Sequence, residues 1–495
     1  MNVETPDGLK ADVQVEEPRL YKAREPIFPK DVSGKFRTFK WRMLIGALAV
    51  YYLLPWMRWP RGEFAPNQAV LIDLANRRFY FFWIEIWPQE FYYVAGLLIM
   101  AGIGLFLITS SVGRAWCGYF CPQTVWTDLF MWVERKIDGD RNAQIKLHSQ
   151  PMNAEKRAKR IKKHAAWLGI ALATGGAFVF YFADAPTLLW QLITLQASNV
   201  AYATIGILTF TTYSLAGLMR EQVCIYMCPW PRIQGAMLDQ RSLTVTYNDW
   251  RGEPRLRGLK AREAARTSEK AVGDCVDCNA CVAVCPMGID IRNGQQLECI
   301  TCALCIDACD NVMEKVGLPK GLISYNTFAD YEAQSKGDHR PAPVMQRLFR
   351  PRTLAYFGVW ALIGAAMLFT LAGRDRINLT VLHDRNPLFT QLSAGDIRNG
   401  FTVKALNMIP EERRFRLSME GLEDATMVVA GFDDEPGRAV EFDVAPDVLR
   451  SLRVFVTSPN AERRREFAFR LDEITATGEL GETARAEATF YGPGR

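Results

Sequence analysis

The chain of 495 residues has a net charge of +5, 49% hydrophobic residues and 12 cysteines. Its length is that of about three domains, and its charged and turn residues are too interspersed for low-complexity disorder outside the N-terminus. An even cysteine count can indicate a disulfide framework, but such frameworks belong to small secreted chains, and the spacings here are those of metal sites.

Five stretches are apolar enough to cross a bilayer, which takes about 20 residues. The first follows a cytoplasmic N-terminal segment, 1–40, and ends at Pro55–Trp59 rather than at a small-residue cleavage site, so we expect an anchor and not a signal peptide. The predicted spans are 41–59, 91–112, 165–184, 200–219 and 353–373.

Lys and Arg predict the orientation of these spans. The N-terminal segment and the loop 113–164 are rich in both, whereas 185–199 contains neither. Residues 230–352 then form a cytoplasmic domain, and the tail 374–495 and the loop 60–90 face the other side of the membrane. All 12 cysteines fall on the cytoplasmic side or at its membrane edge, where a reducing compartment preserves thiols. We expect lipid as a partner and no nucleic acid, because the basic loop 135–163 suits lipid headgroups.

A duplicated motif marks the predicted four-span membrane core, 41–229. Cys117-Gly118-Tyr119-Phe120-Cys121-Pro122 follows the second span, and Cys224-Ile225-Tyr226-Met227-Cys228-Pro229 follows the fourth. Each motif precedes a stretch that suits an interfacial helix with Pro in its first turn. The repeat suggests a pseudo-twofold core, and the spacing places both sulfurs of a pair on one helix face.

These four cysteines are predicted to be catalytic and metal-binding: Cys117, Cys121, Cys224 and Cys228. The alternative, small hydrophobic cysteines at helix ends, does not explain the duplication. Soft thiolates select Cu(I), zinc or iron–sulfur clusters, and four sulfurs without a nearby histidine favour Cu(I) as substrate or bound ion. A reversible disulfide and a further cluster stay open.

Eight cysteines form two runs of the bacterial ferredoxin type within about 271–330, in the domain that opens with a probable strand, 243–247. In such runs the fourth cysteine ligates the other cluster, whereas zinc sites have longer gaps between Cys pairs. We predict two 4Fe–4S clusters. The first is held by Cys275, Cys278, Cys281 and Cys309, and the second by Cys299, Cys302, Cys305 and Cys285.

Other polar residues carry weaker signals. The four histidines, His148, His164, His339 and His383, lie outside the spans, which argues against a membrane haem. Glu85, Gln89 and Glu90 lie near the second span and either border a quinone pocket or form an interfacial turn.

The tail alternates short β-rich runs with turns and predicts an immunoglobulin-like β-sandwich without a site-like constellation, hence a docking module. The expected strands are 378–382, 401–406, 414–419, 426–430, 440–444, 451–457, 466–471 and 486–490. The fold class is therefore a multi-domain membrane protein: a helical bundle of five spans, an α+β dicluster ferredoxin domain and a C-terminal β-sandwich.

This order of elements resembles the FixG/RdxA/CcoG family of bacterial cytochrome oxidase accessory proteins, from about residue 20 onward. The duplicated Cys-x-Tyr-x-Cys-Pro motif with one final span and a β tail is more specific than the ferredoxin runs. The resemblance implies an inner-membrane protein that reduces Cu(II) to Cu(I) for the copper site of a cbb3-type oxidase, with oxidase-assembly and copper-delivery proteins as partners. The four motif cysteines would bind or reduce copper, and the ferredoxin cysteines would supply electrons.

Three functions compete at this point. The first is an oxidoreductase, a cupric reductase. The second is an electron conduit from a cytoplasmic donor or quinol to a periplasmic partner. The third is a non-catalytic assembly scaffold that docks through its sandwich. The sequence identifies no electron donor and leaves the oligomeric state open, with a homo-oligomer among the candidates.

Overall fold

The structure is a computed structural model that describes residues 26–62, 65–258, 265, 267–268, 271–338, 349–432, 436–459, 464–475 and 478–493. His339 lies outside them. The chain divides into two compact units. We call Met1–Ala47, Leu105–Ala173 and Leu208–Thr353 the cysteine unit, because it contains all 12 cysteines. Leu48–Gly104, Thr174–Ile207 and Leu354–Arg495 form the sandwich unit.

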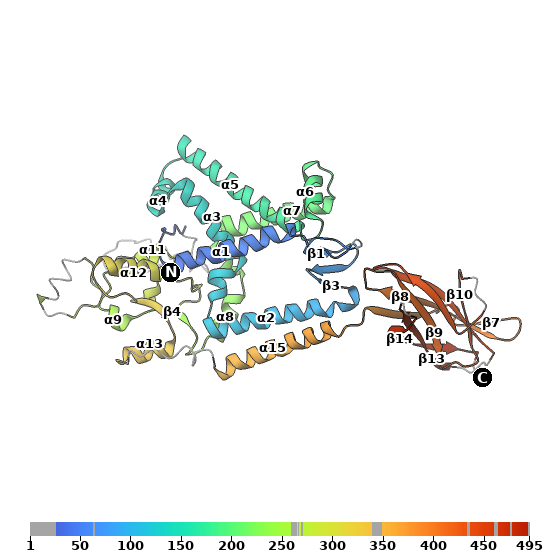
Figure 1. The fold of residues 1–495 in the computed structure, drawn as a ribbon. Helices are drawn as coiled ribbons and strands as arrows, with labels where there is room; N and C mark the ends of the chain where they lie inside the picture. Colours follow the sequence, from blue (N-terminus) through green and yellow to red (C-terminus); the bar gives the residue numbers. More distant parts are fainter. Residues whose placement is uncertain are drawn as a thin grey trace, which may run out of the picture. The chain divides into compact units, whose positions relative to one another are not determined.

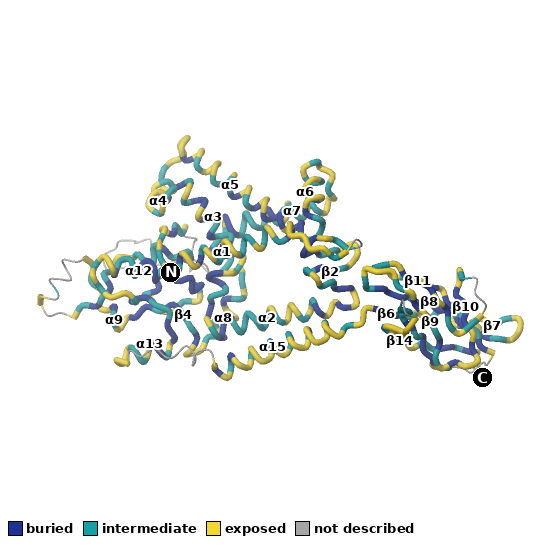
Figure 2. Tube along the Cα trace, in the orientation of Figure 1, coloured by how far each residue is buried: buried dark blue, intermediate teal, exposed yellow. Residues whose placement is uncertain are grey.

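Three helical segments in the described chain are long and apolar enough to cross a membrane: Pro88–Val112, Asn199–Met219 and Pro351–Ala372. They consist of η2 (Pro88–Glu90) with α2 (Tyr92–Val112), α7 (Asn199–Thr212) with η4 (Tyr213–Met219), and α15 (Pro351–Ala372). At most 11% of each apolar window is buried, and Figure 2 shows exposed positions along α15. These apolar surfaces support the predicted spans 91–112, 200–219 and 353–373.

The other two predicted spans, 41–59 and 165–184, fall on helices that do not meet the same criterion. Helix α1 (Lys35–Leu53) has basic residues throughout its first two turns, and α5 (Ala154–Val179) begins with a basic segment that reaches Lys163. The apolar part of each helix is therefore shorter than the helix. The five-span count is not confirmed.

Within the cysteine unit, α1 is anchored to the ferredoxin region at its first turn. The Asp307 carboxylate of α12 (Leu304–Lys315) accepts hydrogen bonds from the backbone N–H groups of Phe36 (3.2 Å) and Arg37 (2.7 Å). Carboxylates at helix N-termini satisfy free N–H groups and complement the helix dipole. The Arg37 side chain is buried against Asp128 of α3 (Pro122–Asp138), with Nη1 at 2.8 and 2.9 Å from the two carboxylate oxygens. Helix α12 and helix α3 are thus tied to the same turn of α1.

The ferredoxin region combines short helices with one β ladder. Strand β4 (Thr244–Tyr247), which the sequence predicts, pairs antiparallel with β5 (Ile323–Asn326). The remaining elements of the cysteine unit are η3 (Trp116–Phe120), α4 (Arg141–Ser149), η5 (Val223–Met227), α8 (Trp230–Met237), α9 (Asp249–Gly252), α11 (Ala280–Ala283), η6 (Ile291–Asn293) and α13 (Phe328–Ser335).

The sandwich unit contains a small sheet that the sequence analysis did not anticipate. Strands β1 (Val70–Asp73), β2 (Arg78–Phe81) and β3 (Ile84–Ile86) pair antiparallel in that order, and the aromatic run Phe79–Trp83 supplies most of β2 and the turn after it. The short helices η1 (Leu54–Trp56) and α6 (Ala185–Ile193) belong to the same unit.

The tail is a two-sheet sandwich, as predicted (Figure 1). One sheet has the order β10-β12-β8-β6 with β7 paired to β8, and the other has the order β11-β9-β13-β14. The strands are β6 (Ile377–His383), β7 (Thr390–Gln391), β8 (Ile397–Asn407), β9 (Arg413–Glu420), β10 (Thr426–Val429), β11 (Ala439–Val444), β12 (Leu449–Ser458), β13 (Arg464–Ile474) and β14 (Leu480–Tyr491).

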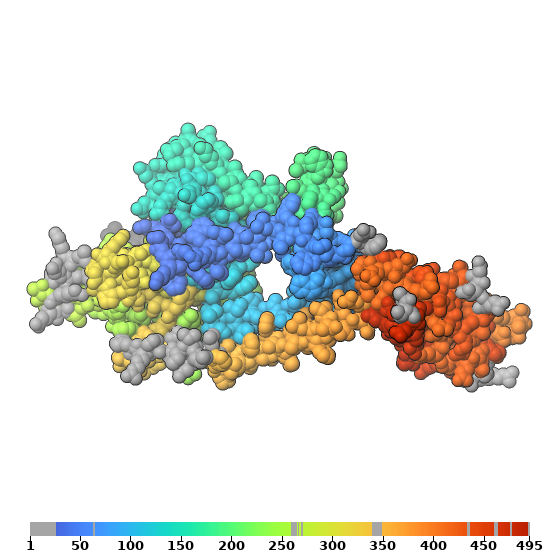
Figure 3. Space-filling model, viewed as in Figure 1, coloured from blue at the N-terminus to red at the C-terminus, as the bar shows by residue number. Residues whose placement is uncertain are grey.

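All eight expected strands fall within strands of the sandwich or overlap them, and only the two-residue β7 was not expected. Alternate residues face the interior, where Phe401, Phe415, Phe469 and Phe490 are fully buried. In the space-filling view the described strands form one continuous orange and red body (Figure 3).

Candidate iron–sulfur and thiolate sites

The four cysteines predicted for the first cluster surround one cavity. Cys275, Cys278, Cys281 and Cys309 line it together with apolar residues of β5 and α12. Three of them are buried, and Cys278 is exposed. The fourth sulfur comes from α12, in the other run, which is the exchange of ligands that the dicluster spacing predicts.

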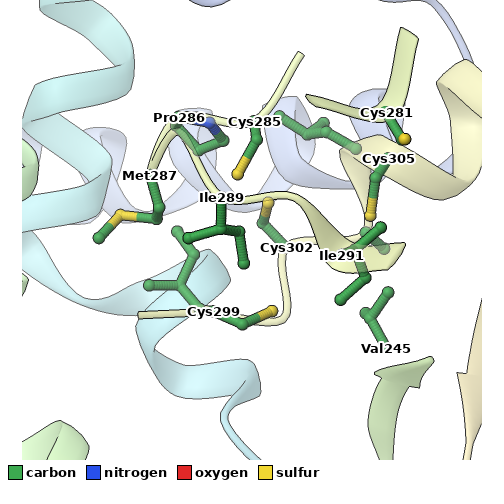
Figure 4. A pocket seen from close by; sticks show the side chains of 13 residues that line it. Val245, Cys281, Cys285, Pro286, Met287, Ile289, Ile291, Cys299, Cys302 and Cys305 are labelled. Carbon is green, nitrogen blue, oxygen red and sulfur yellow. The ribbon is translucent and has the colours of Figure 1, made fainter. Parts of the chain in front are cut away.

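The four cysteines predicted for the second cluster surround a separate cavity (Figure 4). Cys285, Cys299, Cys302 and Cys305 line it, with Cys281 at its margin. In Figure 4 the sulfurs of Cys285 and Cys302 are turned toward each other. The walls are apolar and include Val245, Ile289 and Ile291. A set of sulfur donors inside an apolar wall fits a cubane cluster, so the residues present suit the group that the spacing implies.

The backbone of the two runs repeats the same unusual conformation. The residues on both sides of the second cysteine are left-handed in each run, with φ of 50° and 56° at Asp277 and Asn279 and of 51° and 60° at Thr301 and Ala303. Non-glycine residues adopt this region rarely, and such outliers cluster at functional sites. The repeat therefore extends from the cysteine spacing to the chain path around each cavity.

Burial raises the pKa of five cysteines in the two cavities, Cys281, Cys285, Cys299, Cys305 and Cys309. The pKa rises to about 12 for Cys285 and Cys309 and to about 11 for Cys299, because desolvation disfavours the thiolate. Iron ligation requires the thiolate, and metal binding releases its proton. These five cysteines therefore favour the protonated form until a cation replaces the proton.

The duplicated motifs share a backbone conformation that the sequence did not reveal. Each forms a single π-helical turn, closed by a hydrogen bond from Cys121 N–H to the Trp116 carbonyl (2.9 Å) and from Cys228 N–H to the Val223 carbonyl (2.8 Å). Single π turns occur frequently at functional sites. The sequence predicts that both sulfurs of a pair lie on one α-helical face, but the backbone of each motif is a π turn instead. Helices α3 and α8 follow the two motifs as predicted, with Pro122 in the first turn of α3.

Cys117 is the inner thiol of this group. It is buried, and its thiol donates to Gln234 Oε1 (3.1 Å), while Gln234 Nε2 donates to the Thr109 hydroxyl (3.1 Å). Burial raises the pKa of Cys117 to about 12, against the opposing effect of Arg114. Cys121, Cys224 and Cys228 are close enough to act on Cys117 electrostatically, and these three are only partly buried. The four cysteines, which we call the thiol quartet, thus have a buried end and an accessible end.

The buried end of the thiol quartet packs against the second iron–sulfur site. The Gly118 backbone approaches Ile300 and Cys302 so closely that a Cβ atom would lie 2.7 Å from the Ile300 carbonyl oxygen. The Tyr119 hydroxyl lies 3.2 Å from the Cys302 carbonyl oxygen and 3.3 Å from the Tyr325 hydroxyl. Cys117 and Cys302 belong to one apolar cluster, against which Cys224, Cys285 and Cys305 pack.

All 12 cysteines are free thiols, so neither motif forms a disulfide in this structure. No group of three His, Cys, Asp or Glu side chains within the described ranges converges as the ligands of a single ion would. The sulfurs of the thiol quartet therefore lie near one another but do not converge on a single metal position. The metal-binding role of the quartet stays a prediction.

Among the other predicted candidates, two glutamates and two histidines have structural partners. Glu85 of β3 pairs with Arg78 (3.2 Å), and Glu90 pairs with Arg374 (3.1 Å), so both belong to ion pairs of the sandwich unit. His164 Nδ1 lies 2.9 Å from the Tyr213 hydroxyl, and His383 Nε2 lies 2.8 Å from Asn399.

Comparisons with known proteins agree with this organisation. Residues 219–328 match the family described as a 4Fe-4S dicluster domain, and 94–138 match a 4Fe-4S binding domain. Residues 367–493 match the family described as the immunoglobulin-like fold at the C-terminus of FixG. The only cysteines within 94–138 are Cys117 and Cys121.

Three curated relatives cover most of the chain. It is 61% identical over 462 residues to the nitrogen fixation protein FixG of Rhizobium meliloti, across 89% of this chain and 88% of the relative. It is 52% identical to protein RdxA of Cereibacter sphaeroides, across 96% of this chain and 98% of the relative. It is 55% identical to protein RdxB of the same organism, across 83% and 85%.

The fold, the two cysteine-lined cavities and the matched domains define an iron–sulfur redox protein with helices able to cross a membrane. With more than half of its residues identical to FixG and RdxA over nearly their whole lengths, the chain belongs to the FixG/RdxA family.

Proposed function

We propose that the protein is a membrane-bound cupric reductase that supplies Cu(I) for assembly of the copper site of a cbb3-type oxidase. The observation that carries the proposal is the packing of the thiol quartet on the second iron–sulfur site through Gly118 and Tyr119. Iron–sulfur clusters, when bound, supply one-electron carriers. A soft sulfur set next to such a carrier suits a metal whose reduced ion prefers thiolates.

The reaction is the transfer of one electron to Cu(II), giving Cu(I). Cys121, Cys224 and Cys228 are more accessible than Cys117 and receive the ion, while the buried Cys117 is held in place by Gln234. Thiolate ligands favour Cu(I) over Cu(II) and therefore raise the driving force for reduction. Proton release from the quartet accompanies ion binding, because the ligating form is the thiolate.

The proposed location is the bacterial inner membrane, with five spans, the ferredoxin region in the cytoplasm and the sandwich in the periplasm. The cysteine distribution supports this orientation, because reduced thiols belong to the cytoplasmic side. The sandwich would then meet the copper-delivery and oxidase-assembly proteins.

The test uses purified protein with all clusters loaded. Replacing the thiol quartet by serine is expected to abolish reduction of Cu(II) by dithionite-reduced protein, measured with a Cu(I)-specific chelator. The iron content should stay at about eight irons per chain, as expected for two cubanes, and the cluster spectra should not change. The matched control replaces Gly169, which faces open space on α5, by alanine. Full copper reduction by the four-serine variant would refute the proposal.

A second candidate is a further iron–sulfur cluster held by the thiol quartet, which would make the protein an electron conduit. The match of residues 94–138 to a 4Fe-4S binding domain favours it. The same four-serine variant discriminates. Loss of about four of twelve irons per chain supports the cluster, whereas unchanged iron supports copper.

A further inference from the structure

A short apolar helix of the sandwich unit lies directly before one of the segments that are able to cross a membrane. Helix α6 (Ala185–Ile193) is followed by a turn and then by the segment Asn199–Met219. It has nine residues and is therefore about 14 Å long, which is less than half of the hydrocarbon thickness of a bilayer. Helix α6 is thus too short to cross a membrane by itself.

The two sides of α6 are both apolar, but only one of them is covered by protein. Ala185 and Leu188 are buried in the apolar cluster that α6 forms with the end of α5. On the other side the exposed fractions are 38% for Leu189, 67% for Trp190 and 66% for Ile193 (Figure 2). Contiguous exposed apolar surface marks contacts with a ligand, another protein or a membrane.

The turn after α6 holds one more large apolar side chain away from the protein. The helix ends in a Schellman motif, in which the Gln196 N–H donates to the Gln191 carbonyl (2.8 Å) and the Leu195 N–H donates to the Leu192 carbonyl (3.4 Å). The left-handed position of this motif is usually a glycine. Here it is Leu195, with φ of 58° and an exposed fraction of 80%. A leucine surrounded by water would not offset the steric cost of this conformation, whereas apolar surroundings outside the protein would.

The continuity of this surface with α7 identifies what covers it. We call Leu189, Trp190, Ile193 and Leu195 the α6 patch. Val200, at the start of α7, is 74% exposed, and from Ala185 to Met219 the chain contains no Asp, Glu, Lys or Arg. Because α7 belongs to a segment that is able to cross a membrane, its exposed apolar surface suits lipid, and the α6 patch extends that surface to the membrane boundary. Tryptophan is enriched at this boundary, so Trp190 agrees with the placement.

We propose that α6 lies in the membrane surface, with the α6 patch inserted among the acyl chains of the leaflet in which α7 begins. The ligand is the apolar part of the phospholipid and not a charged headgroup, because the patch has no basic residue. Asp184 marks the edge of the water phase, where its carboxylate caps α6 at the Thr187 N–H (3.2 Å) and pairs with Arg58 (2.6 Å). The inference concerns the membrane boundary of the sandwich unit and does not depend on copper reduction.

The experiment uses the full-length protein in phosphatidylcholine nanodiscs, with its clusters oxidised. A ketone-bearing amino acid replaces Trp190 or Ile193 and carries a nitroxide, which spares the 12 cysteines. Electron paramagnetic resonance then compares collisions of the nitroxide with oxygen, which dissolves in lipid, and with a water-soluble nickel chelate. We expect collisions with oxygen to be several times more frequent than collisions with the chelate at both positions. More frequent collisions with the chelate would overturn the proposal, and so would protection from both reagents, which would show a protein cover.

The control position is Leu480 on β14, an apolar residue of the same unit that is 56% exposed. The same label there should meet the chelate more often than oxygen. Leu195→Gly relieves the left-handed backbone and removes the apolar side chain, so the ratio of oxygen to chelate collisions at residue 193 should fall; an unchanged ratio would overturn the role of Leu195. Adding phosphatidylglycerol to the nanodiscs should leave the ratio unchanged, whereas insertion only with this anionic lipid would overturn recognition of the apolar part.

Discussion

The contact between Gly118 and the second iron–sulfur site predicts the effect of a single methyl group. In Gly118→Ala the Cβ atom would lie 2.7 Å from the Ile300 carbonyl oxygen and 3.2 Å from Cα and N of Cys302. Ordinary contact begins at 3.4 Å, so the backbones must separate by about 0.7 Å. Both obstacles are backbone atoms, which cannot rotate away. We expect a loss of about 1–3 kcal/mol in the free energy of unfolding, as for other overpacked sites, and slower copper reduction.

The control for this variant is Gly169→Ala, because Gly169 is also helical, lies in the cysteine unit and has nothing within 4 Å of its Cβ position. Alanine there should stabilise the helix by about 0.5–1 kcal/mol. The assay is denaturant unfolding in detergent, followed by loss of cluster absorbance, together with the rate of Cu(I) formation. If Gly118→Ala matched Gly169→Ala in both measurements, the close packing of motif and ferredoxin loop would be refuted.

Three further predictions follow from other contacts. Asp128→Asn leaves Arg37, which is 6% exposed, without its charged partner and should lower the free energy of unfolding by about 3–5 kcal/mol. The control Asp443→Asn, at an exposed ion pair, should lower it by at most about 1 kcal/mol. Equal losses of the two variants in denaturant unfolding would contradict the role of burial. Burial, then the charge of Asp447, raises the pKa of Glu85 from 4.5 to about 7. The folded state therefore binds this proton more tightly than the unfolded state. Wild type should lose about 3 kcal/mol of stability relative to Glu85→Gln as pH rises from 4.5 through 7. Parallel profiles of unfolding free energy against pH for the two proteins would contradict this prediction. Finally, Cys275→Ser with Cys309→Ser should remove no more iron than either alone, while Cys302→Ser with Cys309→Ser should remove both clusters; iron analysis showing the reverse would overturn the exchange of ligands between runs.

The sequence predicted the sandwich well because alternation of apolar and polar residues is a local signal. Segments such as 414–419 alternate clearly, and β9 covers them. The sheet β1–β3 was missed because its strands have three or four residues and because the aromatic run from Phe79 to Trp83 does not alternate. The predicted spans 41–59 and 165–184 stay unconfirmed because α1 and α5 begin with basic residues, which shorten their apolar parts.

The candidate site was predictable as far as spacing determines chemistry. The two ferredoxin runs give the donor sets, and the duplicated motif identified the thiol quartet. The supporting contacts depend on residues far apart in sequence: Gln234 bonds Cys117 across 117 positions, and Tyr325 contacts Tyr119 across 206. The π turns likewise depend on backbone hydrogen bonds that no residue pattern indicates.

The central claim is that electrons pass from the iron–sulfur sites to copper at the thiol quartet. A single-turnover experiment tests it directly: protein with both clusters reduced and no excess reductant is mixed with Cu(II), and cluster oxidation and Cu(I) formation are recorded together. Wild type is expected to form about two Cu(I) per chain as both clusters lose one electron. The variant with serine at Cys117, Cys121, Cys224 and Cys228 is expected to keep its clusters reduced. Cu(I) formation at the wild-type rate in that variant would contradict the account.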